Sequence, residues 1–314
     1  MKKLTKHVVK TLAFFDNFNH PLTLQELHRF LWKKEIDFSS LKENIEEIKN
    51  NSLVDFSDGF FYLRDSKEKI ATRQKRVKFI KEKTKIAKKA ARKLTWIPFI
   101  KAIFVCNTLA AKNPDEGSDI DFFIVTEPSR VWLVRFFTNL VLKLFRLRVD
   151  LNSNKVKDKI CLTFFASEEK MNLSEFSISQ PDIYLIYWIQ QLYPLYDPDN
   201  YYEKLITENS WIEDYTPNLS EKKEVISKDK VEPGAISSCV KKVLSAMWQG
   251  SYGDLLENQS RKLQEQRLKS YLGDNYENNE PNVIIKKAVI KLHENDNREE
   301  YKRKWKQTYR EYLG

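Results

Sequence analysis

The stretch FVCNTLAAKNPDEGSDIDFFIV, residues 104–125, constrains this chain most, because it places two acidic residues inside an apolar run. Asp119 and Asp121 alternate with apolar residues, which is the period-two pattern of a strand. Both carboxylates therefore point to one face of the predicted strand, and the apolar side chains point to the other. Burying two adjacent carboxylates costs free energy unless a cation lies between them, so the pattern indicates a metal site.

The segments around this stretch predict a small mixed sheet. A strand is expected at 101–106, a second at 119–126 and a third at 159–167, with a helix from Ser129 to about Arg148. The order strand, loop, strand, helix, strand is typical of a compact α/β sheet. Oxygen ligands at this spacing suit a hard cation, Mg²⁺ or Mn²⁺, with room left for substrate phosphates.

The net charge of +10 is concentrated in one segment of the chain. Residues 66–101 carry fourteen basic and two acidic side chains, a net charge of +12, whereas residues 1–65 are neutral. Apolar residues at helical spacing predict one or two helices with a single buried stripe, formed by Ile70, Val77, Ile80, Ala87, Ala90 and Leu94. The lysine-rich outer face is either a solvated surface or a binding surface for RNA, DNA or nucleotide phosphates.

The N-terminal residues have the pattern of a winged helix over 1–65. Three helical patterns, at 4–15, 23–34 and 38–50, precede a hairpin. Asp58-Gly59 marks its two-residue turn, which requires positive φ at both positions. The third helix is net acidic, so we expect a role in packing or protein contact rather than in reading DNA.

The expected architecture is α+β. A core with a small mixed sheet is expected at 96–170, after the winged helix and a basic helical connector at 66–95. Residues 171–314 are predicted to be a helical C-terminal region, with a polar linker near 221–234 and two or three helices in the last eighty residues. A chain of 314 residues is long enough for two or three domains.

Composition argues against several classes of protein. Apolar content of 41% is typical of a globular chain, and three scattered cysteines, Cys106, Cys161 and Cys239, fit neither a disulfide framework nor a zinc motif. Cys161 is interpreted as a small core hydrophobe. The N-terminus has no signal-peptide pattern, and the apolar run 131–147 carries three cations, so we predict a cytoplasmic protein without membrane contact.

The carboxylate strand resembles the nucleotidyltransferase superfamily, which includes DNA polymerase beta, the CCA-adding enzymes and the kanamycin nucleotidyltransferases. The family pattern is an apolar strand, Gly-Ser or Gly-Gly, about a dozen residues and then Asp-h-Asp. Here the Asp119-Ile120-Asp121 triplet matches that pair, and eleven residues separate Asn107 from Asp119. The likeness covers about residues 96–170. With the winged helix and ENSWIEDYTPN at 208–218, the chain looks like an uncharacterised prokaryotic group of nucleotidyltransferase-like proteins.

The resemblance implies catalytic metal ligands at Asp119, Asp121 and Asp150. Asp150 would be the third carboxylate, on the strand after the helix, and Asp158 and Glu168 are weaker substitutes for it. The metal would be Mg²⁺ or Mn²⁺, and the substrate a nucleoside triphosphate.

The resemblance also implies a phosphate-binding loop, where the chain departs from the family. Cys106-Asn107 stands in place of Gly-Ser, and Ser118 precedes the carboxylate pair as in many members. Asn107 would hold a phosphate oxygen through its amide, together with Ser118. Neighbours on a strand face opposite ways, so Cys106 is expected to face the core if Asn107 faces the site.

Two functions remain open on this basis. The first is metal-dependent transfer of a nucleoside monophosphate from an NTP to a hydroxyl of RNA, protein or a small molecule. The second is an inactive module that binds nucleic acid, through residues 66–101, or a partner protein. Five aromatic residues could stack on a base, although their helical spacing favours core packing: Tyr184, Tyr187, Trp188, Tyr193 and Tyr196. The four histidines are isolated and form no ligand pair: His7, His20, His28 and His293.

Overall fold

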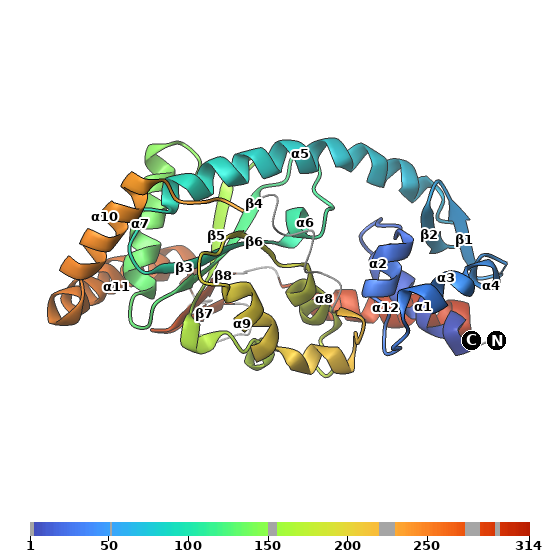
Figure 1. Ribbon diagram of the computed structural model, residues 1–314. Coiled ribbons are helices and arrows are strands. Elements are labelled where there is room, and N and C mark those ends of the chain that lie inside the picture. The colour runs from blue at the N-terminus through green and yellow to red at the C-terminus, as the bar shows by residue number, and fades with distance from the viewer. Residues whose placement is uncertain (1–2, 51, 150–155, 220–229, 274–282, 293–295) are drawn as a thin grey trace.

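The computed structural model describes all residues except 1–2, 51, 150–155, 220–229, 274–282 and 293–295. The described residues form twelve α-helices, a six-stranded mixed sheet and a separate two-stranded hairpin, which is an α+β architecture. Figure 1 shows an elongated molecule in which one long helix runs from the N-terminal elements across to the far side of the sheet.

The N-terminal module consists of short helices and the hairpin: α1 (Lys3–Asp16), α2 (Leu24–Arg29), α3 (Phe38–Glu43), α4 (Ile45–Lys49), β1 (Val54–Ser57) and β2 (Phe60–Leu63). The hairpin turn has φ of 54° at Asp58 and 82° at Gly59, as the sequence predicts. The second predicted helix is shorter than expected and ends at Arg29. Beyond Arg29, the backbone N–H of Trp32 donates a hydrogen bond to the Thr11 hydroxyl, so this N–H is satisfied without a continued helix.

Helix α5 (Glu68–Leu94) is a single helix of 27 residues that crosses the molecule (Figure 1). Its buried stripe includes most of the predicted apolar residues, but Val77 is 59% exposed, so that part of the prediction is wrong. In this half of α5, cationic side chains form ion pairs with the N-terminal module: Arg73 Nη2 lies 2.7 Å from Glu26, and Lys69 Nζ lies 2.6 Å from Asp16. Six other cations of α5 remain exposed: Lys75, Lys78, Lys81, Lys85, Lys89 and Arg92.

The central sheet has the order β6-β3-β4-β5-β8-β7. Its strands are β3 (Ile100–Cys106), β4 (Ile120–Thr126), β5 (Ile160–Ser167), β6 (Tyr193–Tyr196), β7 (Val283–Ile285) and β8 (Val289–Leu292). Strands β4 and β5 are parallel and are connected through α7 (Val131–Leu144), whereas the other pairs are antiparallel. The three central strands were expected. The outer three lie in regions that the sequence predicted to be helical.

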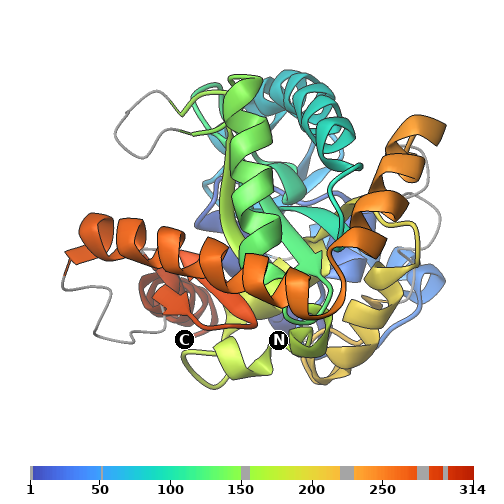
Figure 2. The same cartoon turned by 90° about the vertical axis from the view of Figure 1, so that its left-hand side faces the viewer.

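The remaining helices cover both faces of the sheet (Figures 1 and 2). They are α6 (Asn107–Ala110), α8 (Ile183–Gln191), α9 (Tyr201–Glu208), α10 (Ala235–Met247), α11 (Gly250–Leu272) and α12 (Arg298–Leu313), with short 3₁₀ helices at Glu168–Lys170, Ser174–Phe176 and Ser210–Asp214. Helix α12 packs on α1, where Trp305 Nε1 donates a 2.8 Å hydrogen bond to the Lys10 carbonyl. The two ends of the chain therefore lie side by side (Figure 1).

Two apolar layers form on opposite faces of the sheet, because side chains alternate along each strand. Phe104 and Phe123 pack on the side of α8 and the N-terminal module, whereas Phe122 and Ile124 pack on the side of α5 and α7. The odd-numbered residues of β4 therefore share the α8 side. Within the described ranges, no helix has both the length and the apolarity to cross a lipid bilayer.

Candidate functional site

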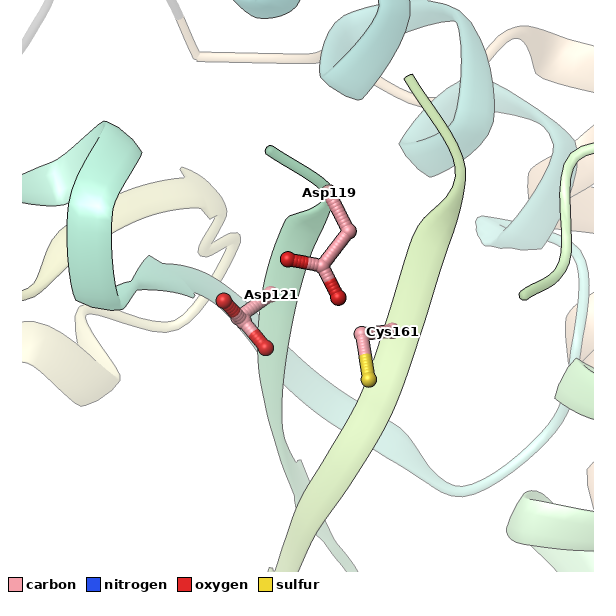
Figure 3. Close-up of side chains that lie close together, drawn as sticks. All are labelled: Asp119, Asp121 and Cys161. Atoms are coloured by element: carbon pink, nitrogen blue, oxygen red, sulfur yellow. The ribbon is translucent and has the colours of Figure 1, made fainter. Parts of the chain in front are cut away.

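Asp119 and Asp121 lie at the start of β4, on the α8 side of the sheet. Asp121 is paired in register with Cys106 on β3 and with Cys161 on β5. One ligand atom from each of Asp119, Asp121 and Cys161 lies within 4.8 Å of the others. Figure 3 shows the three side chains pointing toward one another from two neighbouring strands. The period-two spacing thus places both carboxylates within reach of one cation.

Cys161 was missed as a member of this site. The interpretation as a core hydrophobe is wrong, because its thiol is only partly buried and hydrogen-bonds to Asp119. The local sequence of β5 looks like an ordinary buried strand. Only the parallel register between β4 and β5, which sequence patterns do not specify, brings residue 161 beside residue 121.

Burial makes this cluster unfavourable when both carboxyl groups are charged. Burial raises the pKa of Asp119. Burial together with the Asp119 charge raises the pKa of Asp121 well above its usual range. Burial and the two carboxylates raise the pKa of the Cys161 thiol as well. A divalent cation bound between the two carboxylates would offset both the cost of their burial and the repulsion between them.

Lys83 of α5 positions the loop that leads into the carboxylate strand. Its side chain is 1% exposed, and Nζ donates to the carbonyls of Ser118 at 2.7 Å and Glu116 at 3.3 Å. The same Nζ lies 2.8 Å from Asp158, which therefore serves as an ion-pair partner and not as a third ligand. The Ser118 hydroxyl donates to the Asp115 carbonyl at 3.1 Å and closes the turn.

Of the other proposed carboxylates, Asp158 and Glu168 do not join the cluster of Asp119, Asp121 and Cys161. Glu168 follows the far end of β5, where its carboxylate accepts a hydrogen bond from the Tyr201 hydroxyl. Asp150 lies outside the described residues. A cation near the cluster comes from Arg148, whose guanidinium hydrogen-bonds to Cys161 and is attracted by both aspartates. Its Nε donates to Asn139 at 2.8 Å.

Cys106 and Asn107 both face the cavity beside Asp121. The expectation that they face opposite ways is wrong, because β3 ends at Cys106 and Asn107 begins α6 with a φ of 53°. Asn107 Oδ1 accepts a 2.8 Å hydrogen bond from Trp188 Nε1, and the Asn107 side chain also hydrogen-bonds to Asp121. In this structure Asn107 is therefore a bridge between an aromatic wall and a carboxylate.

The cavity next to Asp121 has a volume of about 260 Å³. Five aromatic side chains contribute to its walls: Phe164, Phe176, Tyr184, Trp188 and Tyr301. The Tyr184 and Tyr301 rings are stacked, with centroids 5.6 Å apart and an interplanar angle of 18°. Tyr301 belongs to α12, far beyond the carboxylates along the chain, and no local sequence pattern indicates its place here.

The expected aromatic set divides between cavity and core. Tyr184 and Trp188 line the cavity, whereas Tyr187 is fully buried and its hydroxyl donates to the Phe30 carbonyl at 2.9 Å. Tyr196 is buried in edge strand β6, which also contains Tyr193.

The described histidines form separate structural hydrogen bonds. His7 bonds to the Trp32 carbonyl, His20 to the Asn113 side chain and His28 to the Ile36 carbonyl. His293 lies outside the described residues.

An ion cluster forms the cavity wall contributed by α12. Arg298 pairs with Asp182 at 2.8 Å and with Asp296 at 2.6 Å, and Lys291 lies 3.3 Å from Asp296. Burial and the Arg298 charge lower the pKa of Lys291 to about 8. The cavity lining thus combines the carboxylate of Asp121 with a charge-balanced ion cluster around Arg298.

Comparison of the chain with protein-family models, curated proteins and solved structures found no match.

The double substitution C106G/N107S tests the loop. It restores the Gly-Ser pair of the resembled family and offers a serine hydroxyl to a phosphate oxygen, so we expect nucleotide affinity to rise about fivefold, the equivalent of one net hydrogen bond. The melting temperature should fall, because glycine leaves Cys106 packing unfilled. Titrations of ATP, GTP, CTP and UTP with Mg²⁺ measure the effect. The single variants are the controls, and weaker binding by the double variant would contradict the expectation.

Proposed function

We propose that this chain is a metal-dependent nucleotidyltransferase that moves a nucleoside monophosphate from an NTP to a hydroxyl of RNA, protein or a small molecule. One observation carries the proposal: two adjacent carboxylates converge at the mouth of an aromatic cavity. The order of elements around them supports a nucleotidyltransferase core within residues 96–170, and the N-terminal helices with their hairpin support a winged helix.

The donor set fits a divalent cation. Asp119 and Asp121 would hold Mg²⁺ or Mn²⁺, and the bound cation would neutralise phosphate charge and activate the attacking hydroxyl. The stacked rings of Tyr184 and Tyr301 offer a flat apolar surface for a base, and the Asn107 bridge fixes Trp188 beside it. Lys83 holds the entering loop so that both carboxylates keep their positions.

A second candidate is favoured by the departures from the family pattern. Asn107 already binds Trp188 and Asp121, and Cys106 fills space next to the carboxylate. Among the described residues, no third carboxylate joins the pair. These features suit an inactive module that binds nucleic acid through the exposed cations of α5, or a partner protein.

The deciding experiment is label transfer. The protein is incubated with each α-labelled NTP, Mg²⁺ or Mn²⁺, and cell extract, and both labelled products and pyrophosphate are measured. Metal-dependent labelling that is lost in D119N supports the enzyme. Folded protein that binds labelled RNA without releasing pyrophosphate supports the second candidate.

The thiol in the cluster should change metal preference. Because sulfur favours softer cations, we expect C161S to bind Cd²⁺ about tenfold more weakly than the wild type and to bind Mg²⁺ unchanged. Calorimetric titration measures both ions. C239S is the matched control, since Cys239 is exposed on α10. Equal Cd²⁺ affinity in C161S and C239S would show that Cys161 is no ligand.

A further inference from the structure

A second cavity, of about 560 Å³, lies between α7 and α11, which cross in Figure 2. Four cationic side chains contribute to its lining: Arg135, Lys143, Arg148 and Arg267. No described residue of the lining is acidic. Phe136, Leu140 and Tyr271 supply an apolar wall. The cavity is thus strongly positive on one side and apolar on another.

Arg135 is the most unusual residue of this cavity, because it is only 6% exposed and lacks a carboxylate partner in the described part of the chain. Three other arginines are comparably buried, and each has a carboxylate partner: Arg73 with Glu26, Arg130 with Asp254, and Arg298 with Asp182. Leaving a buried charge without a counter-charge is strongly unfavourable in proteins.

The hydrogen bonds of Arg135 leave part of its guanidinium unused. Nη1 donates to Gln264 Oε1 at 2.7 Å, but Nε finds no acceptor in the described structure. Gln264 is itself fixed, since its amide donates to the Trp132 carbonyl at 2.8 Å. Burial and the nearby Arg148 charge lower the pKa of Arg135 to about 10, so the side chain remains cationic at neutral pH. A fixed, charged and partly unsatisfied donor needs an anionic acceptor.

The remaining cations are arranged to receive the same ligand. Arg148 donates to neutral acceptors, Asn139 and the Ile160 carbonyl, and Lys143 and Arg267 are exposed at the opening. None of these three forms an ion pair with a described carboxylate. Guanidinium groups favour phosphate because their forked donors match its oxygens.

We infer that the α7–α11 cavity binds the phosphate groups of a nucleotide-sized phosphorylated compound, held by Arg135, Arg148, Lys143 and Arg267 with its apolar part against Phe136 and Tyr271. The volume is within the range of small-molecule sites. Arg148 also faces Asp119, Asp121 and Cys161, so a ligand here would change the charge around the carboxylate pair. This site needs no metal and does not depend on the proposed transfer reaction.

Binding of ADP and of inorganic pyrophosphate in EDTA tests the inference. Chelation removes any metal contribution from the carboxylate pair, so this test can fail or succeed independently of the transferase. Calorimetry should show binding to the wild type. The variant K143Q/R267Q should bind at least roughly tenfold more weakly, because two charge-assisted contacts are lost and both residues are exposed and tolerate change. R135Q should weaken binding at least as much.

K85Q/K89Q is the matched control, because it removes two exposed charges from α5. It should bind within twofold of the wild type. Equal affinity for both probes would assign recognition to phosphate alone, and tighter ADP binding would assign a role to the apolar wall. Absence of wild-type binding to either probe, or equal losses in K85Q/K89Q and K143Q/R267Q, would overturn the inference.

Discussion

Asp121→Asn is expected to reduce nucleotidyl transfer to the level of the metal-free protein while leaving the fold intact. Asparagine keeps the shape of the side chain, so the cavity walls are preserved. It removes one of the two charges that would attract the cation, and the remaining carboxylate of Asp119 cannot hold it alone. Pyrophosphate release with Mn²⁺ is the measurement. D115N, an exposed carboxylate of the same loop, is the control.

The same variant should change how stability depends on pH. The folded pKa of Asp121 is raised, so the folded state keeps a proton that the unfolded chain loses near pH 4. Without metal, the contribution of Asp121 to stability is therefore greatest at low pH and falls as the pH rises toward the folded pKa. In EDTA at pH 8, D121N should be more stable by on the order of 1 kcal/mol or more, and the difference should vanish near pH 4. Urea unfolding at several pH values measures this slope. Full turnover, or lower stability at pH 8, would contradict the metal role.

Arg298→Ala is expected to give the largest loss of stability, about 3–5 kcal/mol. The substitution leaves the carboxylates of Asp182 and Asp296 without their guanidinium partner, and their side chains are 2% and 4% exposed. Asp182 also caps α8 by accepting the backbone N–H of Leu185, so helix and cavity wall are disturbed together. A fall in melting temperature of about 10 °C is the expected size for a chain of this length.

R303A is the matched control for Arg298, since Arg303 lies exposed on the same helix. R298K separates charge from geometry: it should recover part of the stability, because lysine restores the charge without the forked donors. If R298A and R303A unfold at the same urea concentration, the ion cluster does not stabilise the cavity.

The carboxylate pair and the central strands could be predicted because the pattern that specifies them lies in a few neighbouring residues. Alternation around Asp119 and Asp121 fixes strand and face together, and Asp58-Gly59 specifies its own turn. The same holds for α5, whose apolar residues mark most of its buried side. Val77 fails because cations, not apolar side chains, fill the inward positions near it.

The outer strands and part of the cavity could not be predicted because they depend on contacts between residues far apart in the sequence. Strand β8 pairs with β5 across more than 120 residues, and β6 is a four-residue strand containing Pro194 after a helix with strong apolar periodicity. Cys161 gains its role only from register, and Tyr301 gains its role only from the packing of α12. None of these pairings leaves a periodic pattern in the sequence.

The placement of β8 and α12 has a consequence during translation. Strand β5 acquires its outer neighbour, and the aromatic cavity its Tyr301 and Arg298, only after residues 289–313 have emerged from the ribosome. A nascent chain that stops before residue 283 carries Asp119 and Asp121 but has an open sheet edge and lacks the cavity wall contributed by residues 291–301. A complete aromatic cavity is therefore restricted to chains synthesised past this point, and prematurely terminated fragments expose an unpaired β5 edge that chaperones and proteases can recognise.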